Sequence, residues 1–214
     1  MVFVFSDLSN VSSNVKIRHN NIDKTALSQL PGSAPRGYLP NITIGDGNCV
    51  ARSLATLVFG DENKYHLEMR LRLIHELVSN KPLYLDSAFL NKGCTQEPKD
   101  IVFEMLFLCD DVKDLNDKHA SYEDFVWRTR LLKKELSNWH LHAAAQLLGV
   151  PIISVHPDLG IPRNVNLMRR GFFPSSTDYS LDLEKVLYVM WTSARTDMRD
   201  EHWIPNHTVP LLKN

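Results

Sequence analysis

The stretch Gly45-Asp46-Gly47-Asn48-Cys49 decides how this sequence is interpreted, because it is a glycine-rich loop that ends in a nucleophilic side chain. An extended segment, residues 38–44, leads into the loop. From Cys49 onward the apolar residues have helical spacing, at Val50, Leu54, Leu57 and Val58. The sequence therefore predicts a loop that presents Cys49 at the first turn of a helix.

This position would suit a reactive thiol. Unpaired N–H groups and the dipole at a helix N-terminus stabilise a thiolate and lower the pKa of the thiol. Gly45 and Gly47 would let backbone N–H groups approach a substrate carbonyl, so Gly47, Asn48 and Cys49 are candidates for an oxyanion hole. The alternative is that Asp46-Gly47 is a hairpin turn and Cys49 a small core residue. On these residues alone both interpretations stand.

The composition is that of an ordinary globular protein. The chain has 214 residues, of which 43% are hydrophobic and 23% charged, with a net charge of −1. Such a balance gives no field that would attract nucleic acid or an anionic membrane, so we expect neither as a partner. The longest apolar runs are far shorter than the roughly 20 residues that span a bilayer.

The three cysteines, Cys49, Cys94 and Cys109, lack CxxC spacing. This pattern indicates reduced thiols in an intracellular compartment, cytoplasmic or nuclear. We expect Cys94 to be a loop thiol and Cys109 a core residue. The histidines and cysteines lack the paired short spacings of metal ligands, so we expect no metal and no cofactor. We also expect a monomer.

A breaker-rich stretch at residues 31–35 separates an N-terminal arm, residues 1–35, from a main domain, residues 36–214. A helix is expected from residue 61, with its apolar face at Leu67, Leu71, Ile74 and Leu77 or Val78. Further helical patterns between about 84 and 136 predict a helical subdomain. Residues 157–180 are expected to form a long loop or hairpin.

The other elements alternate between helix and strand. A helical stripe at Leu141, Ala144, Ala145 and Leu148 is closed by Gly149, and residues 152–155 follow as a strand. Residues 186–191 and 207–212 predict two more strands. The fold class is therefore α+β, with a small central sheet flanked by helices.

In sequence order, several motifs in residues 36–214 resemble the ovarian-tumour (OTU) family of cysteine proteases. They are Asp46-Gly47-Asn48-Cys49, Phe59-Gly60-Asp61-Glu62, the helix with Arg70 and Arg72, residues 139–152, and Tyr188-Val189-Met190-Trp191 followed by Asn206-His207-Thr208-Val209-Pro210-Leu211. The resemblance implies a papain-like OTU fold with Cys49 as nucleophile and His207 as general base. His202 is the alternative candidate for the general base.

The family's third catalytic residue is missing from its usual place. Many OTU enzymes carry Asn or Asp two residues after the histidine, and Val209 stands there in this chain. The imidazole could instead be oriented by Asn206, Asp46 or Asn41, or by a backbone carbonyl.

The resemblance implies a deubiquitinase that hydrolyses the bond after the C-terminal glycine of ubiquitin through a Cys49 acyl-enzyme. Its partner would be ubiquitin or polyubiquitin chains, and Trp139 and Phe172-Phe173 are candidates for contact with them, although Trp139 fits a core role equally well. Two alternatives stay open: a hydrolase for another ubiquitin-like modifier, and a weak or inactive ubiquitin-binding OTU module.

Overall fold

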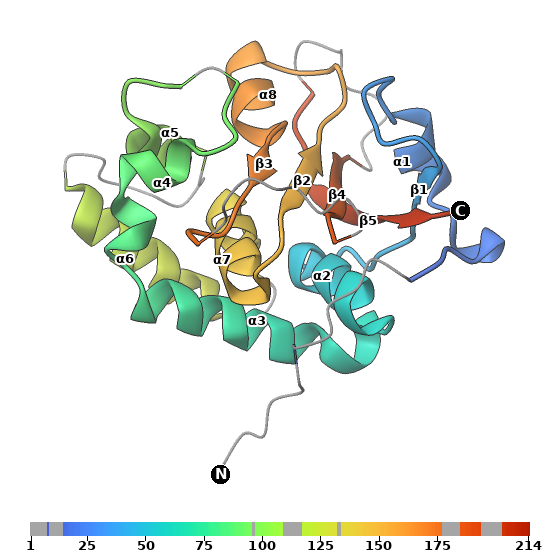
Figure 1. Cartoon of the computed structure of the whole chain (residues 1–214), viewed down its shortest axis with the longest axis horizontal. Helices are drawn as coiled ribbons and strands as arrows, with labels where there is room; N and C mark the ends of the chain where they lie inside the picture. The colour runs from blue at the N-terminus through green and yellow to red at the C-terminus, as the bar shows by residue number, and fades with distance from the viewer. Residues whose placement is uncertain are drawn as a thin grey trace.

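The computed structural model describes residues 8, 15–95, 97–108, 117–131, 134–176, 185–193 and 203–214 (Figure 1). Its centre is a five-stranded mixed sheet with the strand order β1-β5-β4-β2-β3. β2 and β4 pair in parallel, and the other neighbours pair antiparallel. The strands are β1 (Tyr38–Pro40), β2 (Ile152–Val155), β3 (Gly171–Phe172), β4 (Leu187–Thr192) and β5 (His207–Lys213).

The helices form most of the rest of the described chain. Those in the N-terminal half are η1 (His19–Asn21), α1 (Lys24–Ser28), α2 (Cys49–Phe59), α3 (Glu62–Ser79), η2 (Leu83–Leu85) and α4 (Ser87–Asn91). Those that follow are α5 (Ile101–Phe107), α6 (Lys118–Thr129), α7 (Asn138–Leu148) and α8 (Pro162–Met168). The predicted α+β class, with a small sheet flanked by helices, is confirmed.

The sheet is covered on both faces. One face packs with α2 and α7 into the main core, which includes Leu54, Val189 and Leu212. The other face carries Met190 and Val209, which pack with Ala26 of α1 in a smaller cluster. Figure 1 shows α1 beside β1, α3 running beneath α7 and α2, and α4, α5 and α6 grouped at one side. The last strand, β5, is therefore an interior strand buried on both faces.

The described part of the N-terminal arm packs on the body of the protein. Ile22 forms a β-bridge with Asn41, and Gln29 accepts a hydrogen bond from the Thr192 hydroxyl at 2.7 Å. Residue 26 is fully buried. The division of the chain at residue 35 stays a prediction, while residues 15–35 lie against the sheet.

One expectation about an individual segment is wrong, and a second holds only in part. Residues 157–180 do not form a plain loop, because α8 and β3 lie within them and β3 extends the sheet. The buried face of α3 consists of Met69, Arg70, Leu73 and Leu77, whereas Leu67, Leu71 and Val78 are exposed. The apolar pattern favours Leu67 and Leu71 over Met69 and Leu73, and a buried arginine adds no apolar signal that would correct this choice.

This correction of the α3 face has a measurable consequence. Leu73 is 0% exposed and Leu71 is 45% exposed. We expect Leu73→Ala to lower the free energy of unfolding by about 2–5 kcal/mol, because it leaves a cavity in the core. Leu71→Ala should stay within about 0.5 kcal/mol of the wild type. Urea unfolding of the two variants checks this, and equal effects would contradict the observed orientation of α3.

Candidate active site

Cys49 lies where the sequence predicts it, at the first residue of α2, with Asn48 as N-cap. The preceding loop requires glycine at one position: Gly47 has φ +81°, a conformation that other residues rarely adopt. The side chain of Cys49 is 6% exposed and lies next to Thr208 of β5, the strand that packs against α2. The loop and β5 together therefore position the thiol.

The electrostatics of the thiol differ from the expectation. Burial raises the pKa of Cys49 above its ordinary value, although the backbone and hydroxyl of Thr208 and the backbone of Val50 oppose the rise. The helix N-terminus therefore does not produce a lowered pKa here, because the loss of solvent around the thiol outweighs it. The raised pKa disfavours the thiolate in this conformation.

Asp46 fixes the shape of the cysteine loop. Its carboxylate accepts hydrogen bonds from Arg52 Nε at 3.1 Å and Nη2 at 2.8 Å, and from the Asn48 N–H at 3.0 Å. The bond to Arg52 is the main reason why the pKa of Asp46 lies well below its ordinary value. The Asn48 N–H already has a partner, so Gly47 and Cys49 are the better candidates among the three for oxyanion donors.

His207 is the first residue of β5 and lies against the cysteine loop. Its Nε2 is 3.0 Å from the Thr43 carbonyl oxygen, and a Cβ placed on Gly45 would lie 3.6 Å from its Nδ1. A carbonyl oxygen can only accept, so Nε2 carries the proton and Nδ1 is the basic nitrogen. Burial lowers the pKa of His207, which keeps the imidazole neutral. No hydrogen bond joins this imidazole to the thiol among the described residues.

The side chains of Asp46 and Asn41, two candidates for the third catalytic residue, bind groups other than the imidazole. Asp46 faces Arg52, and the Asn41 side chain donates to the Ile42 carbonyl at 2.8 Å. The backbone N–H of Asn206 donates to the Thr192 carbonyl. The imidazole is hydrogen-bonded to the Thr43 carbonyl, which is a backbone group of the kind that the sequence leaves open. No side-chain pattern in the sequence could have identified Thr43 or Thr208.

Other expected positions lie away from this site or outside the described residues. Cys94 is a half-buried loop residue, while Cys109 and His202 fall in segments that the structure does not describe. Within the described ranges no three His, Cys, Asp or Glu side chains gather as a metal site. Trp139 and Phe172 are fully buried. The expectation that they contact a partner at the surface is therefore wrong for both, and Trp139 is a core residue.

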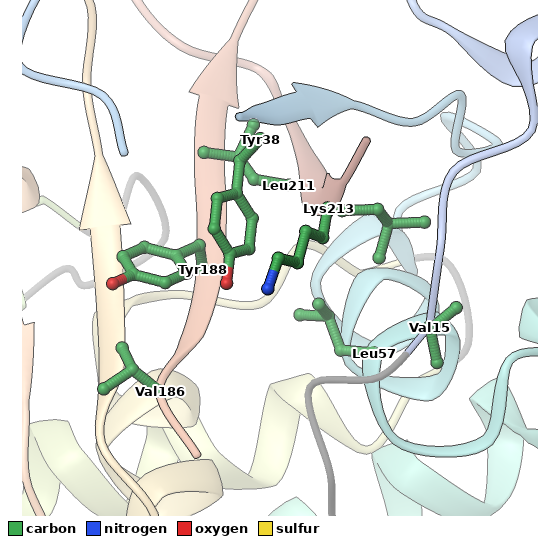
Figure 2. Close-up of a pocket in the computed structure, with 8 residues that line it drawn as sticks. Val15, Tyr38, Leu57, Val186, Tyr188, Leu211 and Lys213 are labelled. Atoms are coloured by element: carbon green, nitrogen blue, oxygen red, sulfur yellow. The ribbon is translucent and has the colours of Figure 1, made fainter. Parts of the chain in front are cut away.

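Figure 2 shows a small apolar pocket that does not belong to this site. It lies at the far ends of the two elements that carry Cys49 and His207, next to Leu57 of α2 and Lys213 of β5. The rings of Tyr38 and Tyr188 meet there with centroids 4.9 Å apart. The residues that line the pocket are Val15, Tyr38, Leu57, Val186, Tyr188, Leu211, Leu212 and Lys213.

The fold and the cysteine loop together define an OTU domain, as the sequence motifs predicted. More specifically, the chain belongs to the family described as Vertnin, OTU domain, whose sequence model matches residues 40–192. That match includes Cys49 and ends before His207.

Among the described helices, none has the length and hydropathy of a membrane-spanning segment.

The chain is similar to vertnin from several vertebrates. Vertnin from Homo sapiens is 25% identical over 183 residues, which cover 79% of this chain and 24% of that protein. Vertnin from Danio rerio is 27% identical over 188 residues, which cover 80% of this chain and 25% of that protein. The chain thus spans about a quarter of the length of the vertnins that it matches.

The chain is also similar to two solved structures of OTU domains. The viral OTU domain protease from Dera Ghazi Khan virus is 12% identical, with a TM-score of 0.49 over 83% of this chain and 81% of that chain. The OTU domain of OTUD1 is 16% identical, with a TM-score of 0.48 over 83% of this chain and 87% of that chain.

Proposed function

We propose that this OTU domain is a cysteine deubiquitinase, with Cys49 as nucleophile and His207 as general base. The observation that carries the proposal is that one loop positions both groups. The loop ends in Cys49 at the start of α2. His207 lies against Gly45 of this loop, and the carbonyl of Thr43, just before the loop, binds its Nε2. The imidazole and the thiol thus lie at the two ends of one loop, and catalytic contacts often tighten only when substrate binds.

The chemistry follows from the tautomer of His207. Nδ1 accepts the proton of the thiol, and the thiolate attacks the carbonyl carbon of the C-terminal glycine of ubiquitin. Backbone N–H groups of Gly47 and Cys49 stabilise the oxyanion. The imidazolium then gives its proton to the departing amine, and water hydrolyses the thioester with Nδ1 again as the base. Asp46 contributes by holding the loop.

A second candidate function has a specific observation in its favour. The thiol is 6% exposed, its pKa is raised, and no hydrogen bond from His207 reaches it within the described part of the chain. A domain that keeps this arrangement on binding ubiquitin would be a non-catalytic binding module. A hydrolase for another ubiquitin-like modifier is the third candidate, because a shared fold does not fix the substrate.

A ubiquitin probe with a C-terminal electrophile separates these functions. For the deubiquitinase we expect a covalent ubiquitin adduct with the wild type and with Cys94→Ser, and none with Cys49→Ala. His207→Ala should slow adduct formation by about 100-fold, because general base catalysis contributes about that much. Intact-protein mass spectrometry follows the reaction.

The other outcomes are equally informative. An adduct with a probe for another modifier, and none with ubiquitin, would establish the third candidate. Silence with every probe, together with measurable ubiquitin binding, would establish the binding module and reject the deubiquitinase.

A further inference from the structure

Arg70 of α3 is buried at the rear of the cysteine loop. Its side chain is 2% exposed, and its Nη1 donates to Asn48 Oδ1 at 2.9 Å and to the Gly47 carbonyl at 3.3 Å. These two residues directly precede Cys49. One guanidinium therefore fixes both the side chain of the N-cap and the backbone that leads to the nucleophile.

The other end of the same guanidinium is anchored in a different part of the fold. Nη2 donates to the carbonyl oxygens of Thr129, Leu131 and Lys134, at 2.6, 2.7 and 2.7 Å. These carbonyls belong to the end of α6 and the segment after it. Five hydrogen bonds from one buried side chain thus join the cysteine loop to the helical subdomain.

The positive charge of Arg70 is buried without a carboxylate partner among the described residues. All five acceptors are uncharged oxygens, and within the described residues no carboxylate forms a salt bridge with Arg70. A buried cation without a counterion is costly, and burial does lower the pKa of Arg70 to about 10. The acidic groups that oppose this shift are Asp46 and Cys49.

Arg70 Nη1 binds the Gly47 carbonyl and the Asn48 side chain, the two residues directly before Cys49, so its positive charge is placed where it would favour a thiolate at Cys49. Asp46 also forms a salt bridge with Arg52, so a thiolate formed at Cys49 during the reaction would be a further counterion for Arg70. The imidazole of His207 is bonded to Thr43 and does not occupy this role.

We propose that Arg70 is a positioning residue for Cys49, which holds the cysteine loop in shape and supplies the positive charge that favours the thiolate. The inference deepens the proposed function and rests on it for its biological meaning. The other charged or titratable groups near this pair are Asp46 and Arg52, Glu135 before α7, which raises the pKa of Cys49, and His140 of α7, which stays neutral beside Arg70.

The test measures the thiol directly and needs no ubiquitin. The rate of Cys49 alkylation by iodoacetamide is followed from pH 6 to 11, with peptide-resolved mass spectrometry to separate Cys49 from Cys94 and Cys109. Arg70→Gln should move the midpoint upward by about one pH unit, which is about tenfold less thiolate at neutral pH. Arg70→Lys keeps the positive charge, so its midpoint should stay closer to that of the wild type than to that of Arg70→Gln.

The matched control is Arg72→Gln, two residues along the same helix, where Arg72 pairs with Glu68 at 2.7 Å. It should keep the wild-type midpoint. Circular dichroism and thermal melting establish that each variant is folded. If Arg70→Gln does not fold, Asn48→Asp places a carboxylate beside Arg70 with little change of shape, and the midpoint should rise because this carboxylate offsets the cation.

An unchanged midpoint in folded Arg70→Gln, or in folded Asn48→Asp, would overturn the inference. The result is independent of the substrate. A silent ubiquitin probe with a shifted midpoint would reject the proposed function alone, and a reactive probe with an unshifted midpoint would reject the role of Arg70 alone.

Discussion

Lowering the pH from 7 to 4.5 should destabilise this domain by several kcal/mol. The cause is a set of three buried histidines, His140, His142 and His156, which are at most 1% exposed. Burial lowers the pKa of His140 to about 3 and that of His156 to about 4, and it holds the pKa of His142 well below its ordinary value. Neither ring nitrogen of His142 has a hydrogen-bond partner within the described structure.

The sign of the effect follows from proton uptake. In the unfolded chain these imidazoles take up protons near pH 6.5, whereas in the folded domain they stay neutral to much lower pH. The unfolded state therefore binds more protons below about pH 6.5, and stability falls as the pH falls through this window. His140 and His156 should each cost on the order of 2 kcal/mol at pH 4.5.

Urea unfolding at a series of pH values measures this loss. His142→Leu keeps an apolar side chain between Phe89 and Phe172, whose rings lie 5.3 and 4.7 Å from the imidazole. This variant should lose less stability on acidification than the wild type. His119→Gln, at an exposed position, is the control and should follow the wild-type profile. A wild-type stability that stays constant between pH 7 and 4.5 would contradict the account.

Arg52→Met should damage both the stability and the reactivity of the cysteine loop. The side chain of Arg52 is 8% exposed and makes two hydrogen bonds to Asp46, and a third to Asn63 Oδ1 at 3.3 Å. Methionine preserves much of the volume but leaves a partly buried carboxylate without its cation. We expect a loss of about 1–3 kcal/mol in the free energy of unfolding.

Arg52→Met should also slow the reaction of Cys49. Asp46 also accepts from the Asn48 N–H, so its release loosens the turn that precedes Cys49. A displacement of about 1 Å at a reacting group can cost about 100-fold in rate, and we expect ubiquitin-probe labelling to slow by about tenfold or more. The pH of the assay should stay near 7 to keep the histidines out of the comparison.

Arg128→Ala is the matched control for Arg52→Met. Arg128 pairs with Asp124 at 2.8 Å on the exposed side of α6, and both side chains are about one third or more exposed. Its loss should change stability by no more than about 0.5 kcal/mol and leave labelling unchanged. Equal losses in the two variants would show that the Arg52–Asp46 pair has no special role in the loop.

The placement of the thiol could be predicted because it depends on local chemistry. A glycine with positive φ, an N-cap residue and a helical pattern all lie within a few positions of Cys49. Each of them corresponds to a residue type or a spacing that can be recognised in the sequence. The strands at residues 152–155 and 207–212 were likewise short apolar runs between turn residues, and β2 and β5 are found there.

The features that could not be predicted depend on contacts between distant segments. The carbonyl that binds His207 lies 164 positions away in the chain, and the acceptors of Arg70 lie up to 64 positions away. Backbone carbonyls are the same at every residue, so no pattern reveals which of them a side chain will reach. A buried arginine also adds no apolar signal, so the pattern could not correct the face of α3.

The order in which the chain is synthesised has a consequence for β5. The cysteine loop and α2 leave the ribosome about 160 residues before β5 does. Because β5 lies between β1 and β4, the sheet cannot close until this final strand arrives. A nascent or shortened chain that ends before β5 therefore leaves the facing edges of β1 and β4 unpaired and lacks His207. Unpaired strand edges of this kind favour aggregation and degradation of the incomplete chain.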